Sequence, residues 1–349
     1  MAGDWIAGSW CVNIEPGDSL TIRKSELNLI ADPDRPDSIT SHGVVIEAAL
    51  LDELHAASHR SLVRFILFTG FYFASAWMLV TLQARSLTVG VLLACVPLYL
   101  IAAASLHGIS LFTHEAVHGV LSRNKVLNRL LGIVCAMPVL QNFSAYKVLH
   151  LQHHSHLGHE GDPDHYDNYT RWTWLVFSMH WLRLIAGYPI YIVMIPILGF
   201  RQGTRADRCW IVAEVVLLFT LIGIAISLTP WQVLLNAWLI PMIMINTMVN
   251  IRGMSQHTFL EEPDDPVRGT RSILTNRVTE FFMCNENYHL EHHLFPRVPW
   301  YNLKRLHSEI KDQLGEREAP FVRSYFAFVC EFIKKSWQRS PLGRRGETA

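Results

Sequence analysis

The 349-residue chain is 50% hydrophobic and only 17% charged, with a positive mean hydropathy of +0.19. A soluble protein carries about 25% charged residues, so this deficit predicts membrane-spanning segments rather than a large soluble core. Thirty Lys and Arg balance thirty Asp and Glu, which argues against a nucleic-acid partner, and the six cysteines lack the Cys-x-x-Cys spacing of a zinc ribbon.

The first 61 residues are polar and interrupted by prolines. They contain no basic stretch followed by an apolar core, so no signal peptide is predicted. An amphipathic stretch, Val44–Leu54, closes this region and indicates a surface helix. We therefore expect residues 1–61 to form an N-terminal cytosolic arm.

Four apolar runs are long enough to cross a membrane, because a spanning helix needs about 20 predominantly apolar residues. They are Phe65–Leu82, Leu87–Phe112, Cys209–Leu228 and Trp231–Val249. The first two lie close together in the sequence, as do the last two, so the pattern predicts two helical hairpins. Residues 126–140 are apolar but short, and we expect them to be buried or re-entrant.

Histidines cluster in three short words, H-E-x-x-H once and H-x-x-H-H twice. The eight histidines of these words are His114, His118, His150, His153, His154, His289, His292 and His293. On a helix, positions i, i+3 and i+4 lie on one face, so each word would direct two or three imidazoles at one place. At this histidine frequency one H-x-x-H-H word arises by chance in roughly one chain in twenty, so two together indicate a site.

The number of histidines indicates how many metals they would bind. Imidazole suits iron, zinc, copper and nickel, so the ligand type alone does not choose the metal. One zinc takes four ligands, and eight histidines, or nine with His257 after the last apolar run, imply two metals. No regularly spaced cysteine or carboxylate accompanies them. An all-imidazole dinuclear site at a membrane surface favours iron and oxygen chemistry.

A shared metal site also constrains the topology, because an even number of spans must then separate the three words. The last two apolar runs supply two spans, so Trp172–Phe200, which is apolar but broken by proline and charged residues, should lie along the interface or re-enter. Most Lys and Arg flank the histidine side, which places the histidines in the cytoplasm. The sequence thus predicts an all-α integral membrane protein with four transmembrane helices and a cytosolic helical cap.

A zinc metalloprotease is an alternative interpretation. His114-Glu115-Ala116-Val117-His118 matches the H-E-x-x-H word of such proteases, in which Glu115 would be the general base. This interpretation leaves both H-x-x-H-H words unexplained, and no obvious motif supplies a third zinc ligand.

The words HEAVH, HLQHH and HLEHH, with the spans placed as above, resemble those of the membrane fatty acid desaturase–hydroxylase superfamily. The resemblance covers roughly residues 60–310, and NYHLEHHLFPRVPW is its most specific part. It implies a centre of two iron ions held by the eight histidines of the words, with His257 as a further ligand. It also implies O2 as co-substrate and two electrons from outside the chain.

The electron donor would be a separate protein, a ferredoxin or a cytochrome b5-like protein with its reductase, because the chain contains no His-Pro-Gly-Gly of a fused cytochrome b5 module. Acidic side chains near the histidines could orient the imidazoles through their second ring nitrogen, although each could equally be a solvated or helix-capping acid. These candidates are Glu115, Glu291, Asp162 and Asp164.

We therefore expect an O2-dependent diiron desaturase that introduces a C=C double bond into an acyl chain of the fatty acid or lipid type. A hydroxylase or carotenoid ketolase of the same superfamily, or a desaturase of a small amino-acid-derived natural product, is the alternative, since all begin with the same hydrogen abstraction. Residues 62–310 would form the desaturase-like domain and residues 311–349 a C-terminal cytosolic tail. The expected location is a bacterial inner membrane or its equivalent.

Overall fold

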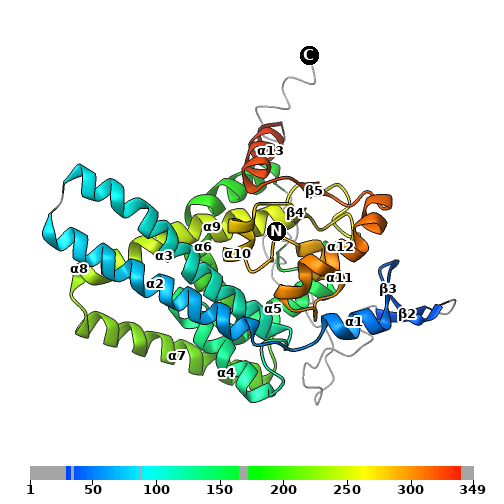
Figure 1. The fold of residues 1–349 in the computed structure, drawn as a ribbon, viewed down its shortest axis with the longest axis horizontal. Helices are drawn as coiled ribbons and strands as arrows, with labels where there is room; N and C mark the ends of the chain where they lie inside the picture. The colour runs from blue at the N-terminus through cyan, green and yellow to red at the C-terminus, as the bar shows by residue number, and fades with distance from the viewer. Residues whose placement is uncertain (1–28, 33–34, 87, 165–171, 339–349) are drawn as a thin grey trace, which may run out of the picture.

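Long helices run side by side through one part of the molecule, and short helices and strands gather at one end of them (Figure 1). This computed structural model describes residues 29–32, 35–86, 88–164 and 172–338. Five helical stretches there are long and apolar enough to cross a membrane. They are α2 (Arg60–Arg85), α3 (Val89–Val117), α6 (Thr173–Gln202), α7 (Arg205–Leu228) and the stretch Trp231–His257. The structure is thus mostly helical, as expected, with five candidate membrane spans in its described part.

Helices α2 and α3 form the first predicted hairpin, although Leu87, where the second predicted run begins, lies outside the described residues. Gly108 of α3 permits their close approach, since a Cβ there would lie 2.3 Å from the ring of Phe68 on α2. Large apolar side chains such as Trp77 (70% exposed) and Leu93 (66% exposed) point outward. Such a surface is expected of helices that face lipid.

The second predicted hairpin consists of α7 and the stretch Trp231–His257. This stretch contains α8 (Trp231–Leu234), a π-helical turn η4 (Leu235–Leu239) and α9 (Ile240–His257). A π-helical turn is rare and occurs mostly at functional sites. Here it presents Asn236 to Tyr99 of α3 and so joins the two hairpins.

Helices α4 (Lys125–Ala136) and α5 (Phe143–Ser155) are linked by the 3-10 turn η2 (Met137–Val139). The two parts of this pair are bent by 103°, as in a broken span or a re-entrant loop. Leu140 adopts a left-handed conformation at the bend (φ 60°). The pair therefore has a shape that a buried or re-entrant segment can take.

Helix α6 differs most from expectation. It is a single helix of 30 residues that continues through Pro189 and Pro196, and it is as suitable for spanning as the other four by length and composition. Proline is tolerated in apolar helices where neighbours satisfy the freed backbone groups. The structure thus contains five candidate spans in its described part, and the four-span count stays a prediction.

The N-terminal region corrects the all-α expectation. Strands β1 (Leu29–Asp32), β2 (Arg35–Ser41) and β3 (Val44–Glu47) form an antiparallel sheet, and only α1 (Ala48–Leu54) is helical within the predicted surface helix. Consecutive β-branched residues at the start of that stretch favour a strand. The molecule is therefore mostly helical, with two small sheets among its described residues.

Four helices and a short parallel pair of strands follow α9 in the chain, and together with the N-terminal sheet and α1 they are here called the cap. They are β4 (Ser272–Ile273), α10 (Arg277–Phe282), α11 (His289–Leu294), α12 (Trp300–Glu316), β5 (Phe321–Val322) and α13 (Tyr325–Gln338). Val44, Leu51 and Leu54 of the N-terminal region share one apolar core with α11 and α12. The predicted boundary after residue 310 falls inside α12, so the domain limits stay predictions.

Candidate metal centre

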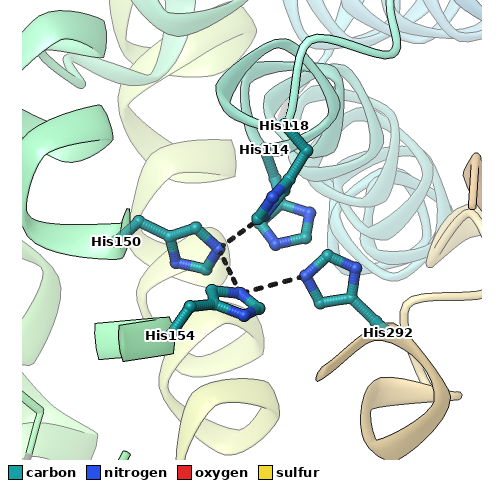
Figure 2. Close-up of side chains that lie close together, drawn as sticks. All are labelled: His114, His118, His150, His154 and His292. Carbon is teal, nitrogen blue, oxygen red and sulfur yellow. Dashed lines mark hydrogen bonds between the residues drawn. The ribbon is translucent and has the colours of Figure 1, made fainter. Parts of the chain in front are cut away.

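Five of the nine predicted histidines form one cluster, here called cluster A, in which all but His154 are buried. They are His114 and His118 near the end of α3, His150 and His154 on α5, and His292 on α11 (Figure 2). One ring nitrogen of each lies within 4.8 Å of one from every other member. Three elements that are far apart in the sequence therefore direct imidazoles into one space.

The spacing within cluster A is that of ligands around a common ion. The Nε2 atoms of His118 and His150 lie 3.0 Å apart, those of His150 and His154 3.1 Å, and those of His154 and His292 3.2 Å. Nitrogens at right angles, each about 2.1 Å from one ion, would lie roughly 3.0 Å apart. The Nε2 atom of His114 is buried without a hydrogen-bond partner, as expected of a nitrogen that binds a metal ion.

The other four histidines form cluster B, which consists of His153, His257, His289 and His293. The Nε2 atom of His289 lies 3.2 Å from that of His257 and 3.0 Å from that of His293. Clusters A and B are adjacent, because the rings of His154 and His293 stack with their centroids 4.2 Å apart. The structure thus brings together all nine predicted histidines, in two groups suited to two metal ions.

The two H-x-x-H-H words divide their histidines between the clusters in opposite ways. On α5 the first and last histidines, His150 and His154, belong to cluster A, and His153 belongs to cluster B. On α11 the first and last histidines belong to cluster B, and the middle one, His292, belongs to cluster A. Positions i and i+4 share a face of a helix while i+3 is rotated from it, so each word contributes to both clusters.

Hydrogen bonds on the outer ring nitrogens orient two members of cluster B. The Nδ1 atom of His257 lies 3.0 Å from the carbonyl oxygen of Gly269, which can only accept, so Nδ1 carries the proton and Nε2 faces the cluster. The Nδ1–H of His153 donates to Oδ1 of Asp162 at 2.8 Å. Such partners fix the tautomer of metal-binding histidines.

Asp162 is the only one of the four predicted carboxylates found hydrogen-bonded to a cluster imidazole among the described residues. The carboxylate of Glu115 accepts from the backbone N–H of Trp300 (3.1 Å). Glu291 contacts His307 and Ser272 instead. Asp164 is exposed, and its backbone N–H donates to Asp162.

Sequence reasoning missed Glu286, which is 1% exposed and lies 3.0 Å from Nδ1 of His114. Its position three residues before His289 was the available signal, because the same i, i+3 spacing drew attention to the histidine words. Burial alone would raise the pKa of this carboxyl, but the imidazoles of His114 and His289 hold its pKa well below the usual value. Glu286 is therefore a buried anion beside the clusters.

The cap histidines are in the protonation state that metal binding requires. Burial, and then the neighbouring imidazoles, hold the pKa of His292 and of His293 well below the usual value. Both rings are thus neutral at physiological pH, and neutral imidazole is the form that binds metal ions.

A cavity of about 860 Å³ adjoins both clusters and extends along α6. His114 and His150 of cluster A and His153, His257 and His289 of cluster B are among its lining residues. Apolar side chains of α6, such as Met194 and Leu198, also line the cavity, and Arg183 and Arg252 contribute charge. A substrate held here would lie against both clusters.

Comparison with known proteins agrees with this geometry. Residues 90–325, more than half of the chain, match the model of the fatty acid desaturase family. The chain belongs to that family. It is 22% identical over 257 residues to a protein of Synechocystis named sn-1 acyl-lipid omega-3 desaturase (ferredoxin), covering 63% of this chain and 70% of that protein.

Other desaturases are similarly distant from this family member. The identity is 23% over 253 residues to an sn-1 oleoyl-lipid 12-desaturase of Picosynechococcus, with 63% of this chain and 70% of that protein covered. It is 22% over 286 residues to the chloroplastic omega-6 fatty acid desaturase of Spinacia oleracea, with 69% and 60% covered. These desaturases resemble the chain over about two thirds of its length.

Family membership and geometry together weaken the zinc protease interpretation of this desaturase-family chain. A protease of that type needs Glu115 to face a water molecule on the metal. The side chain of Glu115 is instead 3% exposed and bonded to the backbone of Trp300. His114 and His118 also share their cluster with three further histidines, which a protease would not require.

Proposed function

We propose that this chain is an O2-dependent diiron desaturase that introduces a C=C double bond into an acyl chain. The observation that carries the proposal is the pair of adjacent all-imidazole clusters beside one cavity, in a chain of the desaturase family. Cluster A and cluster B would each hold one iron. Iron bound there supplies the chemistry of O2 activation, with two external electrons per turnover.

The protein residues would contribute position and protection from water. The cavity along α6 would hold the substrate with one C–H bond beside the clusters, and burial of seven of the nine histidines would keep bulk water away from the oxidant. Oriented outer partners such as Asp162 would keep each imidazole aimed at its ion. Electrons would come from a ferredoxin, which the names of two relatives include, or from a cytochrome b5-like protein with its reductase.

A polar substrate is a second candidate, favoured by the charged and amide side chains of the cavity. Arg183 and Arg252 line it together with Asn250 and Gln256. These groups suit a small substrate with an acidic or polar head, such as an amino-acid-derived molecule, better than a uniformly apolar chain. Hydroxylation or ketolation would use the same clusters, because all these reactions begin with hydrogen abstraction.

Product analysis separates these candidates. Purified chain with reduced ferredoxin and O2 should convert an acyl lipid to a product that has lost two hydrogens and gained no oxygen. Mass spectrometry of the products, with 18O2 as the oxygen source, is the measurement. Incorporation of 18O into the product would favour the hydroxylase, and turnover confined to short polar substrates would favour the second candidate. Heat-denatured protein is the control.

We also propose four spans, with the clusters at the cytosolic side and α6 along the membrane surface. The first half of α6 packs on the last half of α9, near cluster B, as the placement of Gly253 against Arg183 shows. The first turn of α5 contacts the first half of α7, where the backbone N–H and the hydroxyl of Ser144 donate to the carboxylate of Glu214. Both ends of α6 then belong on the cluster side, which preserves the even number of spans between histidine words.

Labelling of single cysteines tests this topology. In a chain without its native cysteines, Arg205→Cys at the start of α7 should react only from the cytosolic side, because α6 would not cross the membrane. Arg85→Cys at the end of α2 should react only from the opposite side. A membrane-impermeant maleimide on intact cells and on inverted vesicles gives both results. Reaction of both cysteines from the same side would show that α6 crosses.

A further inference from the structure

Glu286 contacts one histidine of each cluster. Its Oε1 atom lies 3.0 Å from Nδ1 of His114 in cluster A, and its Oε2 atom lies 3.8 Å from Nδ1 of His289 in cluster B. The Nε2 atom of His289 faces the other members of its cluster, as the contact with His293 shows. A single buried carboxylate thus lies between the outer faces of imidazoles that belong to two different candidate ions.

The backbone before Glu286 is strained. Cys284 (φ 46°) and Asn285 (φ 53°) are consecutive residues in the left-handed region, where residues other than glycine are uncommon. The side chain of Asn285 donates to the carbonyl oxygen of Trp300 (3.0 Å) and holds the turn. Strain of this kind persists where the surrounding structure enforces it, and Glu286 directly follows the two strained residues.

The charge of Glu286 is compensated by groups on both sides. Arg252 of α9 places Nη1 3.8 Å from Oε2, with a side chain that is 16% exposed. A buried carboxylate is costly unless it is paired, and the two imidazole N–H groups and the guanidinium supply that pairing. These partners stabilise the Glu286 carboxylate beside the clusters. Glu115 and Glu291 are similarly buried, but their carboxylates bond to Trp300 and His307 instead.

We propose that Glu286 is a positioning residue shared by the two clusters, which holds His114 and His289 as Nδ1–H tautomers and so supports metal binding at both sites. The inference rests on the proposed diiron function. A carboxylate offers one acceptor oxygen to each imidazole, whereas an amide offers one acceptor and one donor. Loss of such an outer partner typically lowers metal affinity about 10–100-fold.

The matched comparison is Glu286→Gln against Asp162→Asn, because each replaces a buried carboxylate by an amide. Asp162 is hydrogen-bonded to His153 of cluster B, whereas Glu286 contacts a histidine of each cluster. Loss of Asp162 should therefore weaken one iron site, and loss of Glu286 should weaken both. Anaerobic titration of the full detergent-purified chain with Fe2+ against a competing chelator measures the two affinities. We expect a decrease of about 10–100-fold at both sites in Glu286→Gln and at one site in Asp162→Asn.

Two further measurements separate positioning from a purely structural role. Melting of each chain in the presence of chelator should be unchanged by Glu286→Gln, while the stabilisation that added Fe2+ gives should be lost. Glu286→Asp, which keeps the charge, should recover part of that stabilisation. A Glu286→Gln chain that binds two irons as the wild type does, weakens at one site only, or unfolds without metal where the wild type does not would overturn the inference.

The same titration distinguishes failure of this inference from failure of the proposed function. A wild-type chain that binds no iron would remove the diiron function, and the inference with it. A wild-type chain that binds two irons, with a Glu286→Gln variant of equal affinity, would leave the diiron function standing and remove only the role of Glu286.

Discussion

His292→Ala and His293→Ala should each abolish turnover, and each should remove a different iron. The two residues are adjacent on α11, but His292 belongs to cluster A and His293 to cluster B. Each variant removes one imidazole from one site and leaves the other set complete. Iron analysis should therefore give about one iron per chain in place of about two, because the intact cluster keeps its full ligand set.

The identity of the remaining iron distinguishes the two variants. Mössbauer spectra should show a lone iron in both, with different parameters, since one is held by the four histidines of cluster B and the other by the five of cluster A. His307→Ala is the matched control. His307 lies on α12 and belongs to neither cluster, but it bonds to Glu291, which is on α11 beside the two substituted histidines. A single zinc that survives His292→Ala would contradict the diiron assignment and revive the metalloprotease interpretation.

The histidines could be predicted from the sequence because their chemistry is carried by residue type and helical spacing. Two H-x-x-H-H words and one H-E-x-x-H word already indicated a common site, and all nine candidates lie in the two clusters. The division of each word between the clusters was not predictable. It depends on how α5 and α11 are rotated against each other, and packing between distant segments decides that rotation.

The orienting carboxylates show the limit of reasoning from neighbours in the sequence. Glu115 and Glu291 lie inside the histidine words, but each adjoins its histidine in the sequence, and neighbouring positions on a helix do not face each other. Glu286 lies outside the words and is 172 positions away from His114 (286 − 114). The turn after α10 brings the two side chains together. A contact of this kind depends on tertiary structure and leaves little trace in the local pattern.

Helical membrane character was predictable from composition, and the details of two elements were not. Hydropathy found the apolar runs, but α6 shows that an apolar helix of 30 residues satisfies the criteria for a span wherever it lies. Strand β3 was missed because the amphipathic pattern over eleven residues suggested a single helix. The first three of these residues are β-branched and form the strand, and only the residues after Glu47 are helical. Pairing with β2, a tertiary contact, decided its structure.

Gly158→Ala should destabilise the chain strongly and reduce iron binding at cluster B. Gly158 adopts a left-handed conformation (φ +69°), and a Cβ there would lie 2.0 Å from the backbone carbonyl oxygen of Pro263. The left-handed conformation alone costs an alanine roughly 1–2 kcal/mol, and the backbone contact requires the two loops to separate as well. The same loop carries Asp162, whose Oδ2 accepts from the backbone N–H of Gly158 (2.9 Å).

Gly119→Ala is the matched control, because Gly119 has nearly the same conformation (φ +73°) with no atom within 4 Å of the added Cβ. It should show only the conformational cost, about 1–2 kcal/mol, and keep both irons. Thermal melting in detergent and iron analysis of the two variants measure the difference. Since the two substitutions strain the backbone equally, the excess loss in Gly158→Ala reports the contact with Pro263. Equal melting temperatures and equal iron content would show that this loop yields without disturbing His153, and that Asp162 is not held where the clusters need it.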